Sequence, residues 1–222
     1  MCRSFQRWGL PRSIKVDNGK PFGDPQRTSV PVMALWLIGL GIDMIWNRPS
    51  TPRDNAKVER MQQTTANWAE AKRCQCCAEL QQHLDQVALV QRERYTVRRL
   101  KGKTRKQCYG ALGQNPRRYH AQCFDADRVY GYLNNVTFMR KVSRNGYFTF
   151  YAQSIYAGTR YTGQSLAIRF DAARKQFLLS EPLKEAFAFF AADNFSPKVI
   201  QALQVCKPLN VKCIKLNAAN SS

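Results

Sequence analysis

The chain has 222 residues and a formal net charge of +20 at pH 7, from 35 Lys and Arg against 15 Asp and Glu. A hydrophobic fraction of 44% is ordinary for a globular protein and argues against wholesale disorder. So large an excess of one charge is typical of chains that meet a polyanion, either nucleic acid or an anionic membrane. The most apolar run, residues 30–42, is too short to span a bilayer, and residues 1–12 contain no apolar signal core. Composition therefore favours nucleic acid over a membrane as the partner.

Eight cysteines are placed irregularly along the chain. In a chain of this size without a secretion signal, they predict reduced thiols and a cytoplasmic location. Residues 74–77 contain a Cys-x-x-Cys motif, and His120 with Cys123 offers a second pair of ligands. That second pair lacks the spacing of a zinc ribbon or finger, so scattered thiols are preferred over a zinc site.

Residues 9–73 have an α/β pattern. In chain order we expect a strand at 13–17, a buried helix at 31–41, a strand at 42–47, a loop at 48–52, and a helix running from Asp54 past Trp68. Pro31 suits the first turn of the buried helix, and a glycine ends it. Asp54 is the predicted cap of the second helix.

Residues 76–125 combine a helix with a basic linker. Leu80, Leu84 and Val87 share one helical face. After this helix, residues 92–118 hold ten Lys and Arg against one acid, with tyrosines interleaved. A charge run is usually a solvated face, but one this dense and this aromatic favours contact with phosphates.

Residues 126–182 change to short β-rich segments. Asn145–Gly146 is the strongest short-range hairpin signal in the chain, and residues 171–175 predict a further turn. Four or five short strands predict a small antiparallel barrel of SH3-like size that binds DNA. The remaining residues predict one helix, starting at Ser196–Pro197, and a frayed end. We therefore expect four parts, at 1–75, 76–125, 126–182 and 183–222.

Two acids are candidates for chemistry. Asp17 ends the first predicted strand, and Glu59 lies in the first turns of the helix after the loop. The stretch between them has room for a crossover helix and a second strand, which can bring the two carboxylates together at the edge of an α/β sheet. Converging acids repel unless a divalent cation lies between them, and Mg²⁺ accepts one or two carboxylates, leaving positions for waters and phosphates. On spacing alone, two ordinary surface acids are the commoner interpretation.

The sequence around these acids resembles the second half of the catalytic core of DDE transposases and retroviral-type integrases. That core carries a D-N-G motif, then L-G-I, then R-P-x-x-P-x-x-N-(G/A)-x-x-E-R. The matching residues are Gly9, Pro11, Ile14, Asp17, Asn18, Gly19, Phe22, Leu40, Gly41, Ile42, Arg48, Pro49, Pro52, Asn55, Ala56, Glu59 and Arg60. Residues 136–170 resemble the β-rich C-terminal segment of insertion-sequence transposases.

The resemblance implies a partial RNase H-like fold followed by an SH3-like domain. It also implies two metal ions, Mg²⁺ or Mn²⁺, that cleave DNA and join the freed 3′ end to a target. Asp17 and Glu59 match the second and third acids of the triad and would hold the metal. Lys57 and Arg60 would hold the strand near the metals, and Asn55 is as well explained by helix capping. The expected DNA contacts are Arg48, Asn55, Lys57, Arg60, Arg98, Arg99, Lys101, Lys103, Arg105 and Lys106.

The sequence departs from the family at its start. The first acid of the triad lies on an opening strand upstream of D-N-G, and residues 1–16 contain no Asp or Glu. We therefore expect little activity from this chain alone, with self-association or an upstream transposase fragment completing the site. Missing strands would also leave the apolar residues 31–42 without a surface to bury against.

Two other interpretations stay open. One is a DNA-binding module without catalysis, built from the basic linker and the barrel, that regulates a transposable element. The other is a generic basic RNA-binding protein, in which the D-N-G and N-A-x-x-E-R arrangement has no role.

Overall fold

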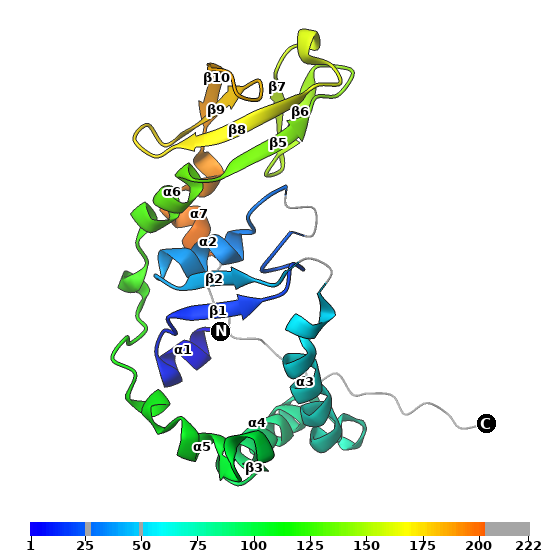
Figure 1. Cartoon of the computed structure of the whole chain (residues 1–222), viewed down its shortest axis with the longest axis vertical. Coiled ribbons are helices and arrows are strands. Elements are labelled where there is room, and N and C mark those ends of the chain that lie inside the picture. Colours follow the sequence, from blue (N-terminus) through cyan, green and yellow to red (C-terminus); the bar gives the residue numbers. More distant parts are fainter. Residues whose placement is uncertain (25–27, 49–50, 203–222) are drawn as a thin grey trace, which may run out of the picture.

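The computed structural model describes residues 1–24, 28–48 and 51–202, which form mixed α/β structure (Figure 1). The molecule is elongated. Antiparallel strands lie at one end, a small α/β unit lies in the middle, and a group of helices lies at the other end (Figure 1).

The α/β unit has the predicted order of strand, helix, strand. Strand β1 (Ser13–Val16) pairs in parallel with β2 (Asp43–Trp46), and helix α2 (Val32–Gly39) makes the crossover between them. Helix α1 (Cys2–Trp8) precedes β1. Parallel pairing puts the carboxyl ends of both strands at one edge, where residues 17 and 47 follow.

The helical end carries much of the basic sequence. Helices α3 and α4 were both predicted, and the basic segment after them folds into a two-stranded ribbon and a short helix. The bounds are α3 (Ala56–Ala69), α4 (Cys77–Glu93), β3 (Thr96–Val97), β4 (Lys103–Thr104) and α5 (Arg105–Cys108). A capping box starts α5, because the side chains of Thr104 and Gln107 each bond to the other residue's backbone N–H.

A long connection runs from α5 back past the α/β unit to helix α6 (Ala126–Asn134) (Figure 1). Arg117 holds it in place, since its guanidinium donates to the carbonyls of Pro11 (2.8 Å), Leu40 (3.2 Å) and Gly41 (2.7 Å). One charged side chain thus joins the connection to the segments before β1 and after α2.

The β-rich end holds six strands and a short helix. They are β5 (Thr137–Lys141), β6 (Tyr147–Phe150), β7 (Gln153–Tyr156), β8 (Ser165–Asp171), β9 (Gln176–Ser180), β10 (Ala186–Ala191) and α7 (Pro197–Gln201). The strand order is β10-β9-β8-β5 in one antiparallel sheet, with β6-β7 as a separate pair. Within the described residues these pairings do not close, so the predicted barrel is not formed. Helix α7 was predicted and β10 was not; the predicted frayed end lies outside the described residues.

The hairpin predicted at Asn145–Gly146 is wrong in its pairing. A tight turn does form there, with Ser143 N–H donating to the carbonyl of Tyr147 at 2.7 Å, but β5 pairs with β8 and β6 pairs with β7. The two-residue loop of the β6–β7 hairpin is Tyr151–Ala152, both at positive φ (46° and 62°) as a type I′ turn requires. Tyr–Ala lacks the Asn or Gly that type I′ turns usually contain, so the tertiary packing of Tyr151 stabilises this turn in place of local preference.

Tyr151 fastens the hairpin to the α/β unit. Its hydroxyl accepts from the N–H of Val30 and donates to the carbonyl of the same residue, both at 2.7 Å. Burial raises the pKa of the Tyr151 hydroxyl, which therefore stays protonated and able to donate.

Helix α2 is buried by elements that follow it in the chain. Ala34, Leu35 and Leu37 are fully enclosed, in one hydrophobic cluster shared with α1, α6 and α7. Trp36 stacks on Phe5 of α1 with ring centroids 6.1 Å apart. The expectation that residues 31–42 lack a surface to bury against is therefore wrong: α6 and α7 cover α2.

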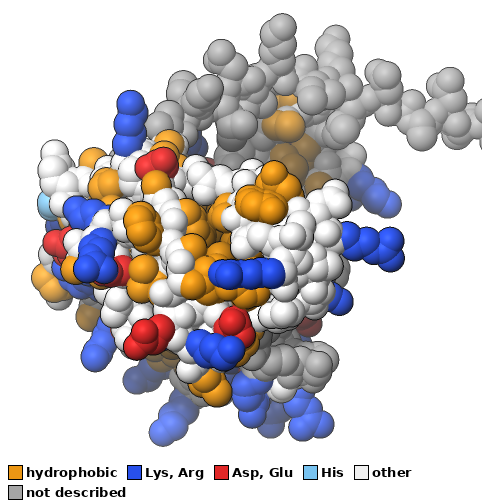
Figure 2. Space-filling model, turned by 90° about the horizontal axis from the view of Figure 1, so that it is seen from above, with side chains coloured by type: hydrophobic (Ala, Val, Ile, Leu, Met, Phe, Trp, Pro, Cys, Tyr) orange, Lys and Arg blue, Asp and Glu red, His pale blue; other side chains and the backbone are white. Residues whose placement is uncertain are grey.

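The outer surface combines cations with some exposed apolar groups. Seen from the β-rich end, hydrophobic side chains gather across the middle while Lys and Arg project around the rim (Figure 2). In the part of the chain that the structure describes, no helix is long and apolar enough to cross a bilayer, and no disulfide joins the cysteines.

Candidate nucleic-acid interface and acidic pair

Asp17 lies directly after β1, at the carboxyl edge of the parallel pair. Its side chain is exposed, and its carboxylate accepts from the backbone N–H of Gly19 at 3.1 Å. This local bond turns the chain away from the strand and leaves the second carboxylate oxygen for another partner.

Three asparagines join the strand ends to the start of α3. The backbone N–H of Asn47 donates to Val16 O (2.9 Å), and Asn18 Nδ2 donates to Asn47 O (3.0 Å). Asn47 Nδ2 in turn donates to Asn55 Oδ1 (2.6 Å). The first residues of α3 are therefore bound to the edge that carries Asp17.

Glu59 follows Asn55 by four residues, so the two side chains share one face of α3. Because Asn55 bonds to Asn47 at the end of β2, this face begins at the carboxyl edge of the strand pair. Both acids are exposed. The structure thus brings the elements that carry the predicted pair together, as their spacing suggested.

The donors around these acids suit a hard cation. They are carboxylate and amide oxygens, which Mg²⁺ prefers over nitrogen or sulfur. Asn47 Oδ1 is buried and has no hydrogen-bond partner among the described residues, although Asn47 lies in the chain of amides just described. The described residues contain no group of three or more His, Cys, Asp or Glu positioned for a metal.

Arg48 and Asp54 form a closed pair beside this edge. Arg48 donates to the Asp54 carboxylate through its backbone N–H (3.1 Å), Nε (3.3 Å) and Nη2 (3.1 Å), and Lys15 Nζ lies 3.6 Å away. These bonds lower the pKa of Asp54 to about 2. The expectation that Asp54 caps α3 is wrong, since the N-cap position is Asn55, whose side chain makes no capping bond. Arg48, expected on DNA, is engaged by Asp54.

A basic groove of about 460 Å³ lies between α3 and the α4–α5 segment. Five of the ten predicted DNA contacts line it, together with two aromatic residues, and none of the lining residues is acidic. The lining residues are Lys57, Arg60, Met61, Thr64, Trp68, Gln91, Tyr95, Val97, Arg98, Arg99 and Arg105. The helix and the basic ribbon, separate in sequence, thus form one cationic surface.

The α3 side of the groove is a single helical stripe. Lys57, Arg60, Thr64 and Trp68 recur every three or four residues, so they point the same way. At 3.6 residues per turn, Glu59 lies roughly half a turn from this stripe. Helix α3 therefore presents Lys57 and Arg60 toward the groove and Glu59 away from it. That these two cations hold a DNA strand near the metals stays a prediction.

Side-chain bonds fix the groove before any ligand enters. Gln91 Nε2 donates to Thr65 Oγ1 at 3.1 Å, which ties α4 to α3, and Arg105 Nη1 donates to Gln91 O at 2.7 Å. Trp68 and Tyr95 contact each other edge to face, with ring centroids 5.3 Å apart. Cations and aromatic rings are therefore held in set positions.

The other predicted contacts lie outside the groove. Lys101 and Lys103 are exposed on the β3–β4 ribbon. Lys106 forms an ion pair with Glu93 at 3.3 Å and lines a neighbouring cavity of about 600 Å³, which shares Arg105 with the groove. Arg92 and Lys106 lower the pKa of Glu93, so this acid of the basic segment stays ionised and its negative charge is balanced by the two cations.

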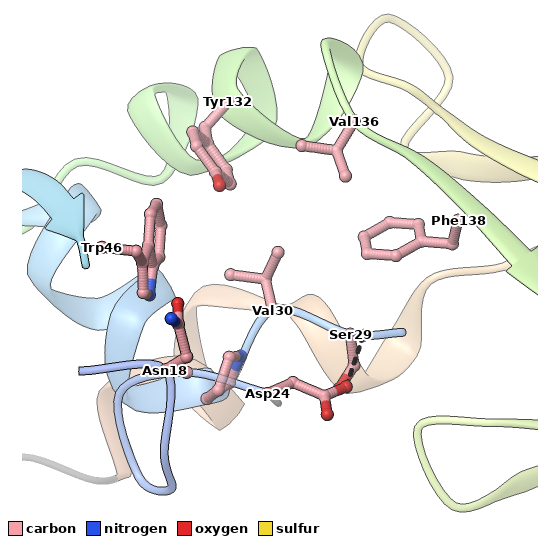
Figure 3. Close-up of a pocket in the computed structure, with 10 residues that line it drawn as sticks. Asn18, Asp24, Ser29, Val30, Trp46, Tyr132, Val136 and Phe138 are labelled. Carbon is pink, nitrogen blue, oxygen red and sulfur yellow. Dashed lines mark hydrogen bonds between the residues drawn. The ribbon is translucent and has the colours of Figure 1, made fainter. Parts of the chain in front are cut away.

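A third hollow, of about 280 Å³, lies between the α/β unit and the β-rich end. Tyr132 and Phe138 form its roof, while Asn18, Asp24 and Trp46 line the opposite side (Figure 3). Its polar groups already bind the surrounding chain: Asp24 Oδ2 accepts four hydrogen bonds from residues 28 and 29, and Trp46 Nε1 donates to a carbonyl. We assign it a structural role at the junction.

Sequence reasoning missed Trp68, Thr64 and Met61 as groove residues. Their helical spacing from Lys57 was the available signal. Of the tyrosines in the basic segment, only Tyr95 lines the groove; Tyr119 packs on Phe5 in the core. No model of a known protein family matches this sequence.

Proposed function

We propose that this protein binds DNA through the groove between α3 and the α4–α5 segment, and that it belongs to the machinery of DNA recombination. The observation that carries the proposal is the lining of that groove: five cations and two aromatic side chains with no acid among them. Cations bind the phosphate backbone, and aromatic rings contact bases or sugars. Such a surface suits a polyanion better than a neutral ligand.

The acidic pair supplies the proposed chemistry. Asp17 and Glu59 would hold Mg²⁺ or Mn²⁺, which, when bound, activates an attacking hydroxyl and stabilises the leaving oxygen of a phosphodiester. Asn47 and Asn55 position the pair, because they bind the start of α3 to the strand ends. Such a pair would match the RNase H-like arrangement of DDE transposases, and the motifs around Asp17 and Glu59 support this assignment.

A second candidate is a DNA-binding module without catalysis. It is favoured by the position of Glu59, roughly half a turn of helix from the groove stripe. The described residues also contain no group of three or more His, Cys, Asp or Glu that could hold a metal. Under this interpretation Asp17 and Glu59 are surface acids, and the protein regulates recombination by occupying DNA.

A cleavage assay separates the two candidates. End-labelled DNA is incubated with the protein and Mn²⁺ or Mg²⁺, beside Asp17→Asn and Glu59→Gln, which keep the size of each side chain. Because little activity is expected from this chain alone, the assay is run with the chain at a concentration that favours self-association and again with an upstream segment that supplies the missing strand. Recombination chemistry predicts metal-dependent nicks in at least one of these conditions, which both variants lose while they still bind DNA. Binding without nicks in the wild type selects the module, and no DNA binding at all rejects both candidates.

A further inference from the structure

The aromatic pair in the groove indicates whether the groove binds paired or unpaired DNA. Trp68 is 39% exposed and Tyr95 is 47% exposed, although both rings are large and apolar. An edge-to-face contact covers one face of one ring and only the edge of the other, so the pair itself leaves ring faces for a further stacking partner. An exposed aromatic pair among five cations is the composition of surfaces on which bases of single strands stack.

We propose that the groove binds an unpaired nucleotide of a DNA strand, with its base stacked on Trp68 or Tyr95 and its phosphates bound by arginines. The inference rests on the proposed function and narrows it to DNA with single-stranded ends or flipped bases. In an intact duplex each base is stacked between its neighbours, so an aromatic side chain reaches a base face only where pairing is broken.

The cations lie where such a nucleotide needs them. Arg98 and Arg99 come from the turn of the ribbon, Arg60 comes from α3, and all three are exposed in the same groove as the rings. Arg105 is held by the carbonyl of Gln91 and cannot swing away freely. The base would therefore lie between two walls that each supply both a ring and a guanidinium.

The volume of the groove agrees with this ligand. About 460 Å³ is within the range of pockets that enclose a small organic ligand, roughly 300–1,000 Å³. That is enough for a base with its sugar and phosphate, whereas a duplex could only lie across the opening. Met61 and Val97 supply apolar surface inside the groove.

Binding of three DNA probes of one sequence tests the inference: a blunt duplex, the duplex with a 3′ single-stranded overhang, and the single strand. We expect the wild type to prefer the overhang and the single strand over the blunt duplex. Trp68→Ala should weaken those two by roughly 5- to 100-fold, the range for loss of one stacked base, and leave blunt-duplex affinity unchanged. Trp68→Phe should retain most of the preference, and Tyr95→Ala should reduce it.

Two controls separate stacking from charge and from folding. Phe189→Ala removes a 69% exposed ring on β10 and should change nothing. Arg98→Ala should weaken all three probes together. Quenching of tryptophan fluorescence by the single strand should disappear in Trp68→Phe, although the other three tryptophans remain.

The outcomes distinguish binding of an unpaired nucleotide from DNA binding in general. Equal affinity for blunt and overhang probes, with Trp68→Ala changing neither or both alike, overturns the inference and leaves DNA binding intact. Failure to bind any probe overturns the proposed function and the inference together.

Discussion

At the scale of single residues, the ion pair of Arg48 and Asp54 holds the residues that lead into α3. Asp54 lies just before the helix, and its carboxylate takes three bonds from Arg48. An arginine in a motif rich in proline is easily assigned to DNA, yet here it holds a loop. The loop, in turn, leads into the helix that carries both Glu59 and the groove stripe.

This pair predicts a loss of stability in acid. The pKa of Asp54 is about 2 in the folded chain and about 3.9 when unfolded, so the pair stabilises the folded state above about pH 4. That contribution disappears as the pH falls toward 2. The difference in free energy of unfolding between wild type and Asp54→Asn should therefore be constant near neutral pH and shrink to zero in that window.

A partner variant provides the control. Arg48→Ala should show the same dependence on pH, and adding it to Asp54→Asn should cost little more, because each substitution breaks the same interaction. A difference that does not change between pH 5 and pH 2 would mean that the pair does not form in solution.

At the scale of elements, α2 is held by close approach to the connection before α6. A Cβ placed on Gly39 would overlap the ring of Phe124, and Gly39 O accepts from the N–H of Asp125 at 2.9 Å. Glycine at this position is therefore a packing requirement, since the ring occupies the space of a side chain.

Two glycine-to-alanine substitutions should change the free energy of unfolding in opposite directions. Gly39→Ala should destabilise the fold by about 1–3 kcal/mol through overpacking against Phe124. Gly131→Ala, inside α6 with open space around it, should stabilise it by about 0.4–1 kcal/mol, because alanine restricts the unfolded chain. Urea denaturation measures both, and a neutral Gly39→Ala would contradict the packing of the connection on α2.

The same elements show what the sequence can predict. The strands of the α/β unit, helices α2 to α4 and strands β6, β8 and β9 follow from local apolar pattern and turn residues, because each is a short-range property. The pairing of β5 with β8 and the packing of α6 and α7 on α2 depend on contacts between segments that are distant in the sequence. No local pattern encodes such contacts. Strand β10 was missed because its alternating alanines carry little strand preference.

The candidate site divides in the same way. Motif spacing predicted that Asp17 and Glu59 meet at one edge, and the structure brings the start of α3 to the edge that Asp17 follows. Charge density marked the arginines of the basic segment that line the groove. The spacing of Glu59 from Lys57, Arg60 and Trp68 on the predicted helix already separates the acid from the stripe by about half a turn. The sequence did not show which of these two faces packs toward the α4–α5 segment. It also left out Trp68, whose role depends on Tyr95 arriving from the far side of the groove.

For the whole molecule, the net charge of +20 raises the question of whether the proposed DNA binding is diffuse or local. Diffuse attraction would make every exposed cation equivalent. The structure instead concentrates five cations in a groove whose walls are tied by Gln91. The central claim is that this groove, and not overall charge, binds DNA.

The most direct test is the salt dependence of DNA affinity in two variants that each lose two positive charges. Arg98→Ala with Arg99→Ala removes charge from the groove, and Arg3→Ala with Lys198→Ala removes charge from exposed positions elsewhere. Each phosphate contact adds about 0.9 to the slope of log affinity against log salt for duplex DNA and about 0.7 for a single strand. The groove variant should therefore lose about 1.8 with a duplex or about 1.4 with a single strand, and the control close to none. Equal changes of slope in both variants would contradict the account and make overall charge the source of binding.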